Sequence, residues 1–123
     1  MKLIELLTET EWGLDVTIEK NAEINNSNFI DMVKIVLNKC KEINKKKILV
    51  DLSTFKQKVS SIKIYEAVKV SQEIVGPGLK LAFVAPNLIK NKDLKFVENV
   101  GFNRAVFIQY FYDKATAIEW LLK

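Results

Sequence analysis

Two adjacent serines, Ser60 and Ser61, follow the apolar run 48–52 after a short polar connection. A short run that is apolar on both faces is typical of a strand in a parallel sheet, and functional groups gather where such strands end. Serine is a preferred helix N-cap, and a phosphate at a helix N-terminus would add about −1.5 to −2 charge where the dipole favours an anion. From these residues alone we predict an unmodified serine cap, with a phosphoserine regulatory site as the alternative.

The same connection carries side chains suited to a protein contact. Exposed lysines and the start of the next helix follow the strand, so the surface from residue 53 to residue 65 is the predicted partner-binding region. Its candidate residues are Ser53, Lys56, Lys58, Ile64 and Tyr65.

Catalytic and metal-binding residue sets are missing from the sequence. The 123 residues include no histidine and one cysteine, Cys40, which excludes Ser-His-Asp and Cys-His nucleophile systems and Cys/His zinc sites. The four glycines form neither a GxGxxG nor a Walker loop. We therefore expect a non-enzymatic domain without metal or cofactor, and we interpret Cys40 as a core residue of a helix.

The net charge of +4 comes almost wholly from lysine, since Arg104 is the only arginine. Nucleic-acid readers use arginine for bidentate contacts, so we expect no nucleic-acid partner and interpret the lysine clusters as solvated surface. Arg104 could bind an anion or form a structural ion pair. No apolar run is long enough for a membrane span, and a single cysteine fits a reducing cytoplasm.

Apolar periodicity predicts one α/β domain over residues 1–123 with the order β-β-α-β-α-β-α-β-α. Apolar and polar residues alternate in 14–19, which indicates a strand with one solvent-exposed face. We expect it to pair with the first strand as an antiparallel hairpin at the sheet's edge. The remaining strands are apolar on both faces, so the rest of the sheet is expected to be parallel and covered by helices. The expected strands are 1–8, 14–19, 48–52, 79–85 and a strand opening at 105–108; the expected helices are 29–44, 61–75, 91–100 and one capped by Asp113.

The segment from Ile48 to Ile62 resembles the STAS domain, which includes the anti-sigma factor antagonists. In that family an Asp-Ser-Ser-Gly motif follows a strand at this spacing, and a partner kinase phosphorylates its first serine. Matched without a gap, Ser60 takes the phosphoserine position and Ser61 the second serine. Val59 stands where the family has an acidic residue, and Ile62 where it has glycine. The resemblance implies a regulatory, protein-binding function.

The C-terminal third is similar to STAS-like domains grouped with CRAL-TRIO lipid-transfer folds. The residues that carry this similarity are 103–107, 111–113, Ala117 and 120–121. It implies an alternative function, the binding of a lipid or other apolar small molecule. A third hypothesis is a homodimer in which the strand 14–19 pairs with a second copy of the chain.

Overall fold

The computed structural model describes residues 3–23, 26–53, 61–85 and 105–123. Strands and helices largely alternate along these residues. The strands are β1 (Ile4–Glu9), β2 (Leu14–Ile18), β3 (Lys47–Asp51), β4 (Leu79–Val84) and β5 (Val106–Phe111). The helices are α1 (Asn26–Ile43), α2 (Ser61–Ile74) and α4 (Lys114–Leu122).

The strands form a single five-stranded sheet in the order β1-β2-β3-β4-β5. β1 runs antiparallel to β2, and the pairs from β2 to β5 are parallel. The predicted α/β class, the N-terminal antiparallel hairpin and the mostly parallel sheet are therefore confirmed. The helix expected over 91–100 lies outside the described residues.

One expectation about the sheet is wrong. The strand at 14–19 was expected to be an edge strand free to pair with a second copy, but β2 is enclosed by β1 on one side and β3 on the other. Its two-residue alternation reflects unequal burial of its two faces, which does not reveal whether a strand lies at an edge. The edge strand of the hairpin is β1.

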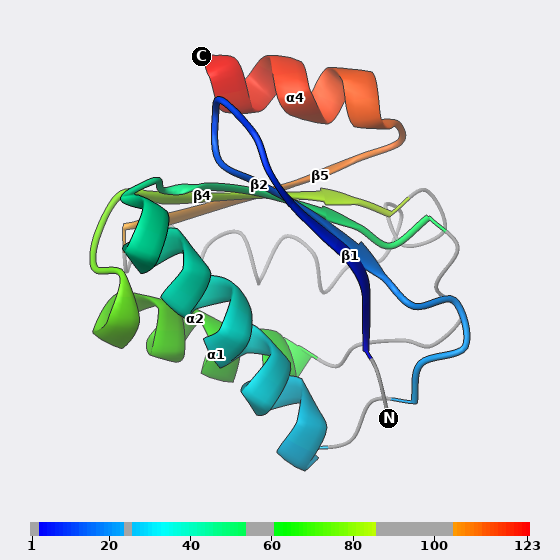
Figure 1. The fold of residues 1–123 in the computed structure, drawn as a ribbon, viewed down its shortest axis with the longest axis vertical. Helices are drawn as coiled ribbons and strands as arrows, with labels where there is room; N and C mark the ends of the chain where they lie inside the picture. The colour runs from blue at the N-terminus through cyan, green and yellow to red at the C-terminus, as the bar shows by residue number, and fades with distance from the viewer. Residues whose placement is uncertain (1–2, 24–25, 54–60, 86–104) are drawn as a thin grey trace.

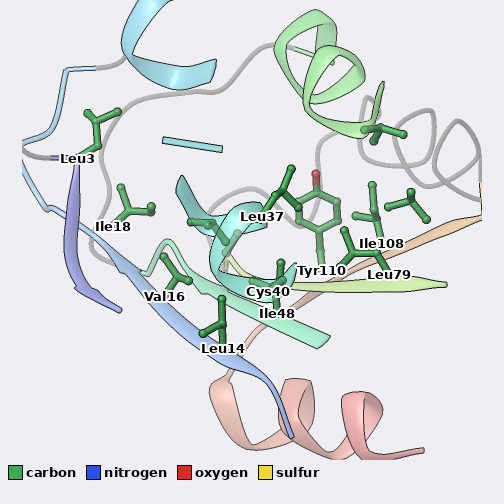
Figure 2. Close-up of a cluster of buried hydrophobic side chains, with 14 of the residues drawn as sticks. Leu3, Leu14, Val16, Ile18, Leu37, Cys40, Ile48, Leu79, Ile108 and Tyr110 are labelled. Carbon is green, nitrogen blue, oxygen red and sulfur yellow. The ribbon is translucent and has the colours of Figure 1, made fainter. Parts of the chain in front are cut away.

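Helices cover both faces of the sheet: α1 and α2 lie on one face and α4 on the other (Figure 1). Alternate residues of each strand point to opposite faces, which divides the buried side chains into two clusters. Figure 2 shows the larger cluster, where Leu14, Val16 and Ile18 of β2 lie on the same side of the sheet as α1. Cys40 of α1 belongs to this cluster and is fully buried, so its predicted place in the core is confirmed.

The second cluster lies between the sheet and α4. Its buried members are Leu49, Ala82, Val84, Phe111, Ala117 and Leu121. Fully burying a leucine such as Leu121 contributes about 2 kcal/mol, so this contact anchors the short C-terminal helix. α4 begins as predicted: Asp113 is its N-cap and accepts a hydrogen bond from the backbone N–H of Thr116 at 2.8 Å. An ion pair of 2.6 Å between Lys114 Nζ and Asp15 Oδ2 joins the start of α4 to β2.

Two lysines of the run 45–47 hold turns at the amino end of the sheet. Lys45 Nζ donates to the carbonyl of Thr10 at 2.7 Å, and Lys46 Nζ donates to that of Pro77 at 2.8 Å. These carbonyls belong to the connections β1–β2 and α2–β4. The interpretation of this cluster as solvated surface is therefore incomplete, because two of its ammonium groups bind backbone oxygens.

Candidate partner-binding site

The candidate site begins where β3 ends, at the carboxyl edge of the parallel strands. Asp51 is the last residue of β3, and it is in register with Thr17 of β2 and Val84 of β4. Its Oδ1 accepts a hydrogen bond from the backbone N–H of Ser53 at 2.9 Å, the local turn that aspartate favours. Leu52 N also donates to Val84 O at 2.9 Å. The chain is thus held to the sheet up to Ser53, whose side chain is exposed as predicted.

The other side of the site is the start of α2. Helix α2 begins at Ser61, and its first turn contains no acidic residue. The positive end of the helix dipole is therefore not offset by a carboxylate there, and Lys63 adds a further positive charge. An anion is the ligand that this arrangement favours electrostatically.

Burial along α2 shows which of its sides is available to a partner. Val68 and Ser71 are buried against the core, and the Ser71 hydroxyl donates to the carbonyl of Ala67 at 2.7 Å. Glu66 and Lys69 are exposed. Tyr65 is half-buried, with Lys69 Nζ 5.9 Å from the centre of its ring, a cation–π arrangement. This aromatic residue presents an amphipathic contact next to a lysine.

The structure places only part of the predicted site. Ser53 and Tyr65 are described with their side chains, whereas Ser61 and Ile64 are described by backbone alone. Four predicted residues lie outside the described residues: Lys56, Lys58, Ser60 and Arg104.

Sequence reasoning missed two contacts in this region. Asp51 was recognised as the polar end of the strand, but not its hydrogen bond that orders the turn to Ser53, for which an aspartate two residues before Ser53 was a usable signal. Lys69 stacks on Tyr65, and the i, i+4 spacing of the two residues within a helix could have identified that contact.

Two titratable groups elsewhere have shifted pKa values. Burial raises the pKa of the Cys40 thiol to about 11, which makes it a poor nucleophile at neutral pH. At the N-cap of α4, hydrogen bonds from the Thr116 backbone N–H and hydroxyl lower the pKa of Asp113 below its usual value.

Within the described residues, no cluster of three or more acidic, cysteine or histidine side chains could hold a metal ion. None of the helices described is long and apolar enough to cross a membrane.

Comparisons with known proteins add no relative. No protein-family model matches the chain, and a search of curated proteins found no match. The fold and the site therefore define an α/β domain with a mixed five-stranded sheet, and a function has to be argued from its own residues.

Proposed function

We propose that this chain is a non-enzymatic regulatory domain that binds a protein partner through the surface between the end of β3 and the first turns of α2. The observation that carries the proposal is the charge of this stretch. Residues 52–65 contain three lysines and no acidic residue, and exposed Glu66 and Lys69, of opposite charge, follow on α2. A partner with an acidic surface is favoured by this charge, chiefly through a faster encounter.

Phosphorylation at position 60 would act as a switch on the same surface. Position 60 directly precedes Ser61, the first residue of α2. A phosphate there adds about −1.5 to −2 charge, which would offset half to two thirds of the positive charge carried by the three lysines. It would also be stabilised by the helix dipole, because the first turn of α2 has no acidic residue. The likeness to the serine motif of STAS domains supports phosphorylation of the same serine. Separately, the single buried cysteine is compatible with the reducing cytoplasm as the place where the chain acts.

Site-specific photo-crosslinking tests the binding function. A photo-reactive amino acid replaces exposed Ser53 in the full-length chain, and a matched probe replaces exposed Glu119 on α4. The proposal expects one protein to be crosslinked from position 53 but not from position 119 in the native cell. The purified partner should then bind the wild-type chain and bind Lys69→Glu more weakly. No protein crosslinked from position 53, together with a lipid that copurifies with the chain, would overturn the proposal in favour of the carrier function.

A further inference from the structure

The hairpin formed by β1 and β2 differs sharply in charge from the rest of the chain. Residues 1–19 contain one lysine and five acidic residues, a net charge of −4, whereas the whole chain carries +4 and residues 20–123 therefore carry +8. The acidic residues are Glu5, Glu9, Glu11, Asp15 and Glu19. Asp15 is paired with Lys114, so the glutamates mark the hairpin as a separate electrostatic surface, distinct from the lysine-bearing connection between β3 and α2.

This acidic hairpin also carries an edge of the sheet. β1 is the terminal strand of the sheet, and among the described residues β2 is its only strand partner (Figure 1). A register shift between Ile4 and Leu6 leaves Glu5 as a bulge, so the regular edge is the segment Leu6–Glu9. An edge strand presents backbone N–H and C=O groups that can pair with another extended chain. The backbone of β1 therefore offers hydrogen bonds, and its side chains must decide which strand fits.

Register with β2 fixes which side chains of β1 share a face. Leu7 and Glu9 are paired with Val16 and Leu14, whose side chains point into the core on the α1 side. Leu6 and Thr8 are paired with Thr17 and Asp15 and point to the α4 side. Leu6 is 58% exposed, although it is a large apolar residue. An added strand would thus lie beside a leucine on each face and beside Glu9 on the α1 side.

Charge disfavours a second copy of this chain as the added strand. Two β1 strands paired about a two-fold axis would bring together two hairpins of net charge −4. An antiparallel pair centred on Leu7 would also bring Glu9 of each copy close to the bulged Glu5 of the other, and like charges close together destabilise a sheet.

We propose that the β1 edge binds an extended segment of another protein by antiparallel strand addition, and that this segment places apolar residues beside Leu6 and Leu7 and a lysine or arginine beside Glu9. An apolar side chain would pack beside Leu7, and a cationic one would pair with Glu9 two residues along the same face. Main-chain hydrogen bonds would supply affinity and the alternate side chains specificity. The inference does not depend on the function proposed for the β3–α2 surface.

Titration of the isotope-labelled, full-length chain with a capped octapeptide that contains Lys-Thr-Val-Val, whose residues would lie opposite Glu9, Thr8, Leu7 and Leu6 in turn, tests this proposal. We expect amide shifts and slowed hydrogen exchange concentrated in Leu6–Glu9, and no binding of a matched peptide in which glutamate replaces the lysine. Glu9→Lys should raise the dissociation constant about tenfold, since an attractive cross-strand pair becomes a repulsive one. Glu66→Lys, the same charge change at an exposed position of α2, should leave binding nearly unchanged.

Three results would overturn the proposal. No binding at millimolar peptide would mean that the glutamates only protect the edge from aggregation. Equal weakening by Glu9→Lys and Glu66→Lys, with shifts spread over the surface, would indicate diffuse charge attraction. If sedimentation showed that the wild-type chain forms a dimer, and that Glu9→Lys alters the strength of this dimer, the edge would be assigned to a second copy.

Discussion

Replacing Gly13 with alanine should destabilise the sheet where the β1–β2 turn meets the start of β3. A Cβ atom at position 13 would lie 1.9 Å from the carbonyl oxygen of Lys47 and 2.8 Å from its carbonyl carbon. Cβ contacts shorter than 3.0 Å essentially never occur, so the two backbones would have to separate by about 1.1 Å. The next residues along, Leu14 and Ile48, are paired in the sheet and both buried, so the separation would disturb the core.

The cost can be worked from this geometry. Overpacking a close contact costs about 1–3 kcal/mol, and a backbone oxygen cannot yield as a side chain can, so we expect about 3 kcal/mol. The turn hydrogen bond from Gly13 N to Thr10 Oγ1, 3.0 Å long, would be disturbed as well. For a domain of this size each kcal/mol lowers the melting temperature by about 3–5 °C, which predicts a fall of about 10 °C.

Gly76→Ala is the matched control, because Gly76 has a positive φ of 90° but no atom within 4 Å of an added Cβ. It should cost only about 1 kcal/mol of backbone strain. Thermal unfolding followed by circular dichroism, together with urea denaturation, measures both variants. A melting temperature of Gly13→Ala within 1 °C of the wild type, or a larger loss for Gly76→Ala, would refute the reasoning about this contact.

Three further predictions concern single residues. Ala105 has a φ of 58°, so Ala105→Gly should stabilise the chain by about 0.5–1 kcal/mol in urea denaturation, and a destabilised variant would contradict this. The pKa of the Asp113 carboxyl is lower in the folded chain than its ordinary value of about 4. The ionised carboxylate therefore stabilises the folded state above about pH 4, and this stabilisation is lost as the pH falls through the folded-state pKa. The melting temperature should therefore fall more steeply between pH 5 and pH 3 for the wild type than for Asp113→Asn, because asparagine keeps a cap but does not titrate. Equal slopes for the two chains would contradict this. With a pKa of about 11, Cys40 should react with a thiol reagent at pH 8 about 100-fold more slowly than in the urea-unfolded chain, and comparable rates would show an accessible thiol.

The sequence predicted the architecture well because its signals were local. Alternation in β2, the doubly apolar β3 and the aspartate cap of α4 each identify an element within a few residues. The continuous apolar residues 48–50 of β3 also indicated a buried, parallel environment, which the sheet confirms.

Non-local features could not be predicted in the same way. That β2 is internal depends on its pairing with β3, about thirty residues further along, and not on its own pattern. The bonds from Lys45 and Lys46 to Thr10 and Pro77 join positions separated by more than thirty residues, for which no periodicity exists. Within the candidate site, a helix start near the serine pair was predictable from the sequence, whereas the contact surface around it depends on how α2 packs.

The measurement that tests the central claim most directly is the affinity of the purified crosslinked partner for the chain with and without phosphoserine at position 60, by calorimetric titration. A second phosphoserine placed at exposed Ala115 on α4 controls for added charge elsewhere. The account predicts binding about tenfold weaker with phosphoserine at position 60 and nearly unchanged with phosphoserine at position 115. Equal affinities for the unmodified chain and the chain phosphorylated at position 60 would contradict the proposed switch, and binding that persists after Lys69→Glu and Tyr65→Ala would contradict the proposed surface.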